Sequence, residues 1–259
     1  MMTNEMIRNT FARLGLTAPD EVRPTKDLLF AVQYAFTQTV PYENIDILHG
    51  IPLSLEEDAL YDKIVTRHRG GYCFEINGFL GMFLRALGYE VTDYMARYLR
   101  GETTIPMRRH RVLIVTCDDG AKYICDAGIG QSAFRYPLPF IEGNEDHQCG
   151  EVYRLDRDDF YGWVISDWHH GAWRRFYGFT EEPQLNIDYV MPSFWCEKHP
   201  DSPFTSAYML SIKTSDGRKT LDGNVFRVFA GEDVTEQILT DEEIPGVLDT
   251  VFGIRYKKF

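Results

Sequence analysis

Hydrophobic positions recur at helical spacing in two segments of the first third of the chain. Between Thr25, a possible N-cap, and Pro41, the apolar residues have spacings compatible with a helix that ends at the proline. After Cys73 a second apolar series steps by four, three, one and three residues, which places its members on one helical face. Gly88 stands where a C-terminal cap is common. The second series is Ile76, Leu80, Phe83, Leu84 and Leu87.

The pattern changes beyond Gly88 to short segments rich in β-branched and aromatic residues. Turn signals such as Asp119-Gly120 separate these segments. We therefore predict an antiparallel sheet or barrel over residues 89–190. The predicted strands lie in 89–99, 110–117, 122–129, 151–157 and 162–168.

The last part of the chain is mixed. Residues 191–204, rich in proline and aromatic side chains, are predicted as a loop that leads into further strands. The acidic segment 231–253 is expected to begin and to end as short helices. The order of helices, strands and a mixed segment predicts an α+β fold in three compact units. Their ranges are 1–88 for the helical unit with the cysteine, 89–190 for the barrel, and 191–259 for the third unit.

Composition and charge narrow the function classes. The 259 residues, 44% hydrophobic and 25% charged, are typical of a soluble globular protein. No stretch approaches about 18 consecutive apolar residues, and the N-terminus lacks the apolar core of a signal peptide, so we expect a cytoplasmic protein without membrane contact. A formal net charge of −12 argues against nucleic-acid binding. An anionic ligand would need a local basic patch.

The five cysteines form an odd set without CxxC or metal-ligand spacing. Neither a disulfide framework nor a metal site is predicted, and reduced thiols are expected. The adjacent histidines of segment 166–179 also lack a cysteine or carboxylate cluster at ligand spacing, so we predict a structural role for this segment.

Cys73 has two interpretations. A single cysteine is most often a small buried hydrophobe. Here, however, it lies in the first turn of the predicted helix, where unpaired N–H groups and the macrodipole favour a thiolate. Gly70 and Gly71 permit unusual backbone angles and leave space near the sulfur. The context therefore makes Cys73 a candidate nucleophile.

A thiolate nucleophile also needs a base and a group that orients the base. His110 opens one predicted strand and Asp126 closes the next, so a hairpin would bring them near each other. Counted from the Asp119-Gly120 turn, the two are three residues out of register, and a longer loop or a bulge would be needed to bring them opposite. Alternatively, His110 lies on the surface of a basic hairpin and Asp126 caps a turn.

Several motifs together resemble the arylamine N-acetyltransferases. They are VPYENIDI at 40–47, RGGYCFEIN at 69–77, RRHRVLIV at 108–115, YICDAGIG at 123–130 and HPDSPF at 199–204. The resemblance extends across nearly the whole chain. It implies an N-terminal helical bundle, a central antiparallel β-barrel and a C-terminal α/β lid around a cysteine-protease-like Cys-His-Asp core. Cys73, His110 and Asp126 would be nucleophile, base and orienting carboxylate.

The resemblance also implies a reaction. Acetyl-CoA would acetylate the cysteine, and an arylamine, a hydrazine or an N-hydroxyarylamine would then take the acetyl group in a ping-pong cycle without a metal. Two alternatives remain. An amide synthase would use the same triad to close an amide on a polyketide thioester, and a binding module would retain the triad without catalysis. A papain-like hydrolase is disfavoured by the short interval between cysteine and histidine.

Further residues within the motifs gain roles from the resemblance. Arg69 and Glu43 would form an ion pair that braces the cysteine segment, unless they are separate surface charges. Tyr42, Tyr72 and Ile129 would contact the substrate. Tyr42 stands where the family usually has phenylalanine, and Ile129 stands at an often aromatic position.

Candidate CoA contacts come from the same comparison and from local charge. Ser202 and Phe204 resemble residues that line the CoA entrance. Arg109 belongs to a run of arginines around His110 that could bind phosphate, since guanidinium groups pair well with phosphate. A solvated hairpin face is the alternative. The run contains Arg97, Arg100, Arg108, Arg109 and Arg111, and a second basic group contains Lys213, Arg218 and Lys219.

Overall fold

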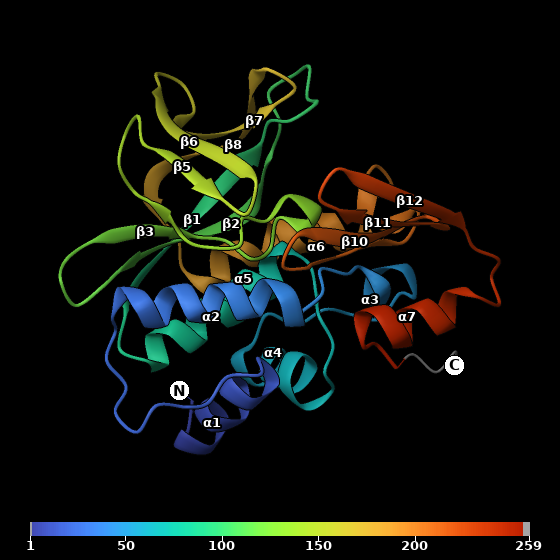
Figure 1. Ribbon diagram of the computed structural model, residues 1–259, viewed down its shortest axis with the longest axis horizontal. Helices are drawn as coiled ribbons and strands as arrows, with labels where there is room; N and C mark the ends of the chain where they lie inside the picture. The colour runs from blue at the N-terminus through green and yellow to red at the C-terminus, as the bar shows by residue number, and fades with distance from the viewer. Residues whose placement is uncertain (1, 256–259) are drawn as a thin grey trace.

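The computed structural model describes residues 2–255. Helices from the first third of the chain lie beneath a strongly curved sheet, and a second, smaller sheet stands beside both (Figure 1). The first-third helices are α1 (Asn4–Arg13), α2 (Lys26–Thr39), α3 (Ile45–Leu48), α4 (Glu57–Tyr61), the π-helical turn η1 (Asp62–Thr66) and α5 (Cys73–Ala86).

Both predicted helices are confirmed, with their caps. The Thr25 side chain accepts a hydrogen bond from the Leu28 N–H, and α2 ends at Thr39, two residues before the proline. Helix α5 begins at Cys73 itself. Gly88 has φ +91°, the left-handed region in which glycine replaces other residues at a helix end.

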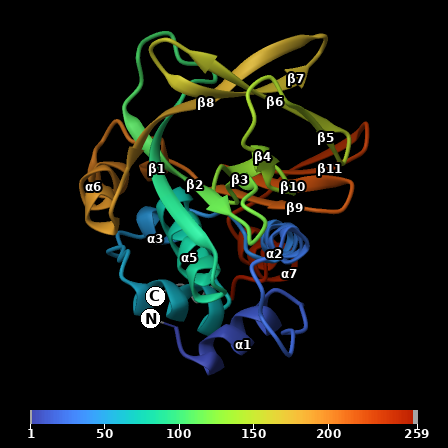
Figure 2. The ribbon, with the colours of Figure 1, turned by 90° about the vertical axis from the view of Figure 1, so that its left-hand side faces the viewer.

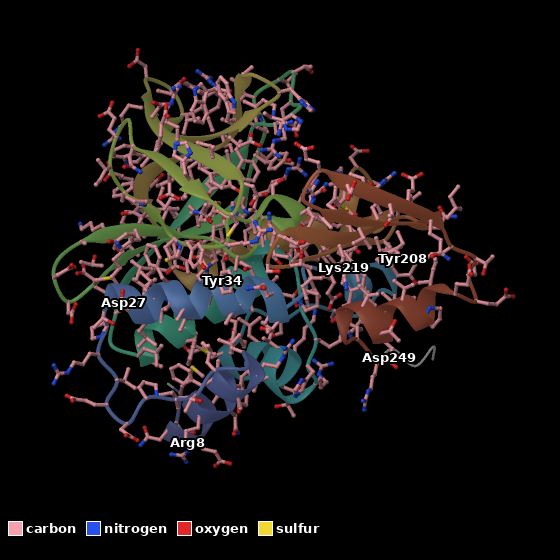
Figure 3. All side chains as sticks on the ribbon, in the orientation of Figure 1. Arg8, Asp27, Tyr34, Tyr208, Lys219 and Asp249 are labelled. Atoms are coloured by element: carbon pink, nitrogen blue, oxygen red, sulfur yellow. The ribbon has the colours of Figure 1, made fainter. Side chains whose placement is uncertain are left out.

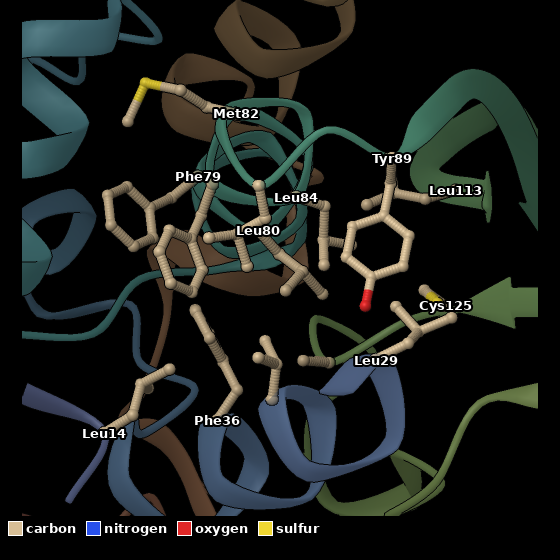
Figure 4. Close-up of a cluster of buried hydrophobic side chains, with 14 of the residues drawn as sticks. Leu14, Leu29, Phe36, Phe79, Leu80, Met82, Leu84, Tyr89, Leu113 and Cys125 are labelled. Atoms are coloured by element: carbon tan, nitrogen blue, oxygen red, sulfur yellow. The ribbon is translucent and has the colours of Figure 1, made fainter. Parts of the chain in front are cut away.

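Helix α5 is the centre of the main core. Leu29 and Phe36 of α2 point at Phe79 and Leu80 of α5, and strand residues such as Leu113 close the side of the cluster (Figure 4). All five side chains are buried. The helix that begins at Cys73 is thus held on two sides, which fixes the position of its first turn.

An eight-stranded antiparallel sheet follows. Its order is β4-β3-β2-β1-β8-β7-β6-β5, and it curls around an aromatic interior (Figure 2). The predicted barrel and the α+β class are therefore confirmed. The strands are β1 (Glu90–Tyr98), β2 (Arg108–Thr116), β3 (Lys122–Cys125), β4 (Leu138–Pro139), β5 (Glu145–Gln148), β6 (Glu151–Asp158), β7 (Gly162–His169) and β8 (Ala172–Pro183).

The last part of the chain forms a second sheet backed by a helix. Helix α7 (Ile244–Phe252) lies along one face of this sheet (Figure 1), where Leu210 and Leu221 pack with Ile244 and Leu248. The sheet is antiparallel, in the order β12-β11-β10-β9. Its strands are β9 (Met209–Lys213), β10 (Gly217–Asp222), β11 (Val225–Ala230) and β12 (Asp233–Ile238).

Two predictions in this region are wrong. Most of the expected loop 191–204 is helix α6 (Val190–Lys198), because Pro192 falls in the first turn, where its missing N–H costs no hydrogen bond. The acidic segment 231–253 begins as β12, not as a helix, because residues 233–238 pair along β11. It ends as helix α7, as predicted. The division into units at 88/89 and 190/191 stays a prediction.

Charged side chains such as Arg8, Asp27 and Asp249 extend outward from the helices (Figure 3). Over residues 2–255, every helix is too short or too polar to span a bilayer.

Candidate active site

Cys73 lies at the wall of a cavity of about 950 Å³. The cavity is bounded by the mouth of the curved sheet and by the second sheet, and His110 also lines it. The Cys73 side chain is only 3% exposed, and its Sγ lies 3.6 Å from the carbonyl oxygen of Arg109. A small ligand that enters this cavity can therefore approach the sulfur.

His110 and Asp126 form a buried pair. His110 Nε2 lies 2.6 Å from Asp126 Oδ2, with the histidine 3% exposed and the aspartate fully buried. The carboxylate accepts a hydrogen bond from Nε2–H, which leaves Nδ1 as the ring nitrogen that can face the thiol. The ring of Tyr177 packs beside the imidazole at a centroid distance of 5.1 Å. Surface placement of His110, the alternative interpretation, is excluded.

The register that joins this pair differs from the predicted one. β2 and β3 pair Leu113 with Cys125, so continuing the ladder by one residue places Asp126 opposite Val112. His110 lies two residues from Val112, so it is offset by two residues from the position opposite Asp126, where the sequence predicted three. The difference arises because the Cys117 N–H and the Ala121 carbonyl close a turn that is one residue longer. Strand side chains alternate faces, so an offset of two leaves both groups on one face. No bulge is needed.

Asn77 is a site residue that the sequence reasoning missed. Its Nδ2 donates to Asp126 Oδ1 at 2.8 Å and to the Arg111 carbonyl at 2.6 Å, and its Oδ1 accepts from the Ala127 N–H at 3.1 Å. Asn77 is fully buried, four residues after Cys73 on α5. That spacing places it above Cys73 on the same helical face, which is the signal that could have identified it.

Burial opposes the ionisation that the helix start favours at Cys73. Burial raises the pKa of the Cys73 thiol well above its usual range, and the neighbouring Cys196 and the Asp126 carboxylate act in the same direction. Backbone N–H groups of Arg111 and Phe74 lower it without compensating. The backbone N–H groups and burial therefore act on this pKa in opposite directions. Ionisation of the sulfur therefore requires a proton acceptor, and His110 on the same cavity wall is the available base.

The two glycines before the cysteine serve close packing. Neither has a positive φ, so neither uses the backbone angles that glycine permits. A Cβ on Gly70 would lie 1.7 Å from the Pro41 carbonyl oxygen, and a Cβ on Gly71 would lie 2.7 Å from Glu75 Oε2. The space they leave is filled by the protein itself and does not open a path to the sulfur.

A buried charge network lies behind the cysteine segment. Arg69 donates to Glu43 at 2.7 Å and to Asp46 at 2.9 Å. Lys63 bridges Asp46 and Glu75, at 2.7 Å each. Glu75 in turn accepts from the Tyr72 N–H at 3.2 Å, immediately before Cys73. Arg69 and Glu43 are thus not separate surface charges.

The predicted substrate and CoA contacts divide into two groups. Tyr42, Ile129, Phe204 and Arg109 line the cavity together with Cys73. Tyr72 and Ser202 are not among the lining residues. The Tyr72 hydroxyl is fully buried and lies 2.6 Å from Ser193 Oγ. The Ser202 hydroxyl donates to the Cys196 carbonyl at 2.5 Å.

Most of the predicted basic run is neutralised internally. Arg109 pairs with Glu102 at 3.1 Å and Arg100 with Asp167 at 2.7 Å, and both arginines line the cavity. The buried guanidinium of Arg111 pairs with an equally buried acid on β1. The surface side chain of Arg108 pairs with Glu182. These pairs lower the capacity of the run to hold phosphate.

Segment 166–179 forms the hairpin between β7 and β8, with His170 at φ +49° in its turn. Among residues 2–255, no group of three or more histidine, cysteine or acidic side chains is placed to hold a metal ion.

Comparison with known proteins finds similarity to N-acetyltransferases in both sequence and fold. A family model described as N-acetyltransferase matches residues 26–258. An arylamine N-acetyltransferase of Mycolicibacterium smegmatis is 36% identical, over 93% of this chain and 89% of that protein. The solved arylamine N-acetyltransferase of Salmonella typhimurium superposes with a TM-score of 0.93, at 28% identity, over 100% of this chain and 94% of that one. The enzyme of Mycobacterium marinum, solved in complex with CoA, has a TM-score of 0.90 at 30% identity, with 96% and 93% covered.

Proposed function

The chain belongs to the arylamine N-acetyltransferase family, and on that premise we propose that it transfers the acetyl group of acetyl-CoA to an arylamine or a hydrazine through a thioester on Cys73. The observation that supports this most directly is that Cys73 and His110 line one cavity while Asp126 holds the far nitrogen of the imidazole. The CoA-bound relative supports CoA as the carrier.

The first half-reaction begins with a proton transfer. His110 Nδ1 takes the thiol proton as Sγ attacks the thioester carbonyl, and the imidazolium is stabilised by the Asp126 carboxylate. The tetrahedral intermediate collapses with loss of the CoA thiolate, which takes the proton back from His110. One thioester replaces another, so the step is close to isoenergetic. We propose the backbone N–H of Cys73, at the start of α5, as a hydrogen-bond donor to the oxyanion of this intermediate.

The second half-reaction consumes the acetyl-cysteine. A neutral arylamine attacks the thioester carbonyl, and His110 takes the amine proton as the intermediate collapses. The Cys73 thiolate leaves and is reprotonated by the imidazolium. Burial raises the pKa of this thiol, so reprotonation is favourable and returns the enzyme to its resting state.

We assign substrate contacts by position. Tyr42 and Ile129 would contact the acceptor, and Phe204 and Arg109 the CoA arm, since all four line the cavity. Tyr72 and Ser202 would act indirectly, by fixing α6 and the turn before Phe204. Residues 191–259 would serve as the lid over this cavity.

The test is intact-protein and peptide mass spectrometry after mixing with acetyl-CoA in the absence of an amine. We expect one acetyl group on the peptide that contains Cys73, and its loss on adding an arylamine. Cys149, the exposed cysteine, is the control: Cys149→Ser should label normally, whereas Cys73→Ser should not. Absence of label in a folded protein would reject the acetyl transfer and favour the amide synthase alternative.

A further inference from the structure

The second sheet presents a polar face to the cavity. Side chains alternate between its two faces: the paired Leu210 and Leu221 pack into the core with α7, while the next pair along β9 and β10 turns the other way. Ser211 and Thr220 are paired across these strands, and both line the cavity. Arg218 is two residues from Thr220, so it lies on the same face and also lines the cavity.

Arg218 differs from the other arginines of the cavity wall. Arg100, Arg109, Arg174 and Arg227 each have a carboxylate within salt-bridge distance. Among the residues that the structure describes, none supplies a carboxylate that close to Arg218. Its Nε donates to Gln131 Oε1 at 3.3 Å, and its guanidinium carbon lies 3.7 Å from the centroid of the Phe229 ring. These contacts orient the guanidinium without neutralising it.

The surrounding charges leave an excess of positive charge. Arg218 lies directly opposite Lys213 in the β9–β10 ladder. Glu151, the acid whose charge acts on Arg218, is already bound by Lys213 at 2.8 Å and by Arg135 at 2.7 Å. Two cations therefore already bind this carboxylate, and Arg218 adds a third positive charge beside them. Asp222, the other acid on this face of β10, is four residues away along the strand, about 13 Å.

Arg218 is tied to the loop that carries the catalytic carboxylate. Its acceptor Gln131 lies in η2 (Gly130–Ser132), shortly after Asp126. In the same loop Gly128 packs against α5 so closely that a Cβ on it would lie 3.0 Å from the Cα of Cys73. Cys73 and Arg218 line the same cavity, so a substrate that fills it can contact both.

We propose that Arg218 is an oxyanion-recognition residue that binds a carboxylate or a phosphate of a substrate held in the cavity, an inference that rests on the proposed acetyl transfer. The guanidinium fork pairs with either group through two parallel hydrogen bonds. Two sources supply this chemistry: an acidic substituent on the acceptor arylamine, or a phosphate of CoA.

The experiment compares Arg218→Gln with Lys219→Gln. The control removes the same charge one residue away, from the opposite face of β10. Three quantities are measured: acetylation of Cys73 against acetyl-CoA concentration, and the KM values for 4-aminobenzoate and for the neutral 4-methylaniline. Equilibrium binding of CoA and of 4-aminobenzoate is measured in parallel.

If the acceptor supplies the anion, Arg218→Gln raises the KM and Kd for 4-aminobenzoate by at least about 10-fold and leaves 4-methylaniline unchanged. If a phosphate of CoA supplies the anion, Arg218→Gln instead raises the acetyl-CoA concentration at half-maximal acetylation and the Kd for CoA by the same factor. Equal values in Arg218→Gln and Lys219→Gln, or equal effects on both amines with no effect on CoA, overturn the inference. Wild-type turnover of 4-methylaniline reports separately on the proposed function, and the binding measurements test Arg218 even without turnover.

Discussion

Asn77 donates a 2.8 Å hydrogen bond to the Asp126 carboxylate from a position one helical turn beyond Cys73. The helix that presents Cys73 therefore also holds the acid that orients His110. The other carboxylate oxygen is the one that accepts from His110, at 2.6 Å. Cysteine, histidine and aspartate come from different elements, and Asn77 fixes two of those elements relative to each other.

Asn77→Ala should lower kcat without a comparable change in the KM for the amine. The loss removes one partner of Asp126 and leaves the Ala127 N–H and the Arg111 carbonyl unpaired, so we expect a loss of about 1–3 kcal/mol of unfolding free energy as well. Steady-state kinetics and urea unfolding measure the two effects. A fall in stability with kcat unchanged would show that Asn77 supports the fold but does not position Asp126.

Asp126→Asn should reduce acetyl transfer far more than it reduces stability. The amide keeps the size of the side chain, but it removes the negative charge that stabilises His110 as imidazolium and can select the wrong tautomer, an effect on the order of 10⁴ in a comparable triad. Stopped-flow acetylation of Cys73 measures this directly. A variant that is folded by circular dichroism and acetylates at the wild-type rate would contradict the assignment of Asp126.

The local sequence was sufficient to predict helices whose ends carry capping or helix-breaking residues. Thr25 and Pro41 bracket α2, and Gly88 follows α5, because caps and breakers act within one turn. The motifs around Cys73, His110 and Asp126 also predicted that these residues lie together, and the structure places Cys73 and His110 on one cavity wall with Asp126 bonded to His110. The register of His110 against Asp126 was missed by one residue, because the loop closed by Cys117 and Ala121 is not fixed by local propensity.

Features that depend on contacts between distant segments could not be predicted from the local sequence. α6 forms where proline and aromatic residues suggested a loop, and its register is set by burial of Ser193 and Cys196 against the cysteine segment. The elevated pKa of the Cys73 thiol likewise depends on how completely the tertiary fold buries it. Propensity describes neighbours along the chain, whereas these features come from neighbours in space.

Arg69→Met should destabilise the protein by about 3–5 kcal/mol, because it leaves Glu43 and Asp46 buried without one of their cations. Arg67→Met is the matched control. Arg67 lies two residues earlier and pairs with Asp62 on the surface, where each side chain is 52% exposed, so its loss should cost at most about 1 kcal/mol. Urea unfolding of both variants measures the difference. Similar losses in the two variants would contradict a dependence on burial.

Lys213 should make the free energy of unfolding rise with pH in the alkaline range. Burial lowers the pKa of this amine from 10.5 to about 8, although Glu151 acts in the opposite direction. Between about pH 8 and pH 10.5 the unfolded chain binds a proton at Lys213 that the folded protein does not. Stability contributed by this residue therefore rises with pH across that window.

The measurement is the difference in unfolding free energy between wild type and Lys213→Met at pH 7, 8.5 and 10. The difference should shift in favour of wild type by up to about 1.4 kcal/mol per pH unit above pH 8. Lys219→Met serves as the control, since its position on the other face of β10 is away from the Glu151 cluster. A constant difference between wild type and Lys213→Met would contradict the lowered pKa.

Gly128→Ala should impair catalysis by disturbing the packing of the Asp126 loop on α5. A methyl group at this position would lie 2.9 Å from Asn77 Nδ2 and 3.0 Å from the Cα of Cys73. The Cα is backbone and cannot give way, so the loop must move and carry the Asp126 carboxylate away from Asn77 and His110. We expect a loss of kcat of at least about 10-fold, since small misplacements in a catalytic group are costly. Gly246→Ala is the control, because its Cβ would meet nothing within 4 Å in helix α7. If Gly128→Ala acetylates Cys73 at the wild-type rate, the loop tolerates the shift and the spacing between Asp126 and α5 is not critical.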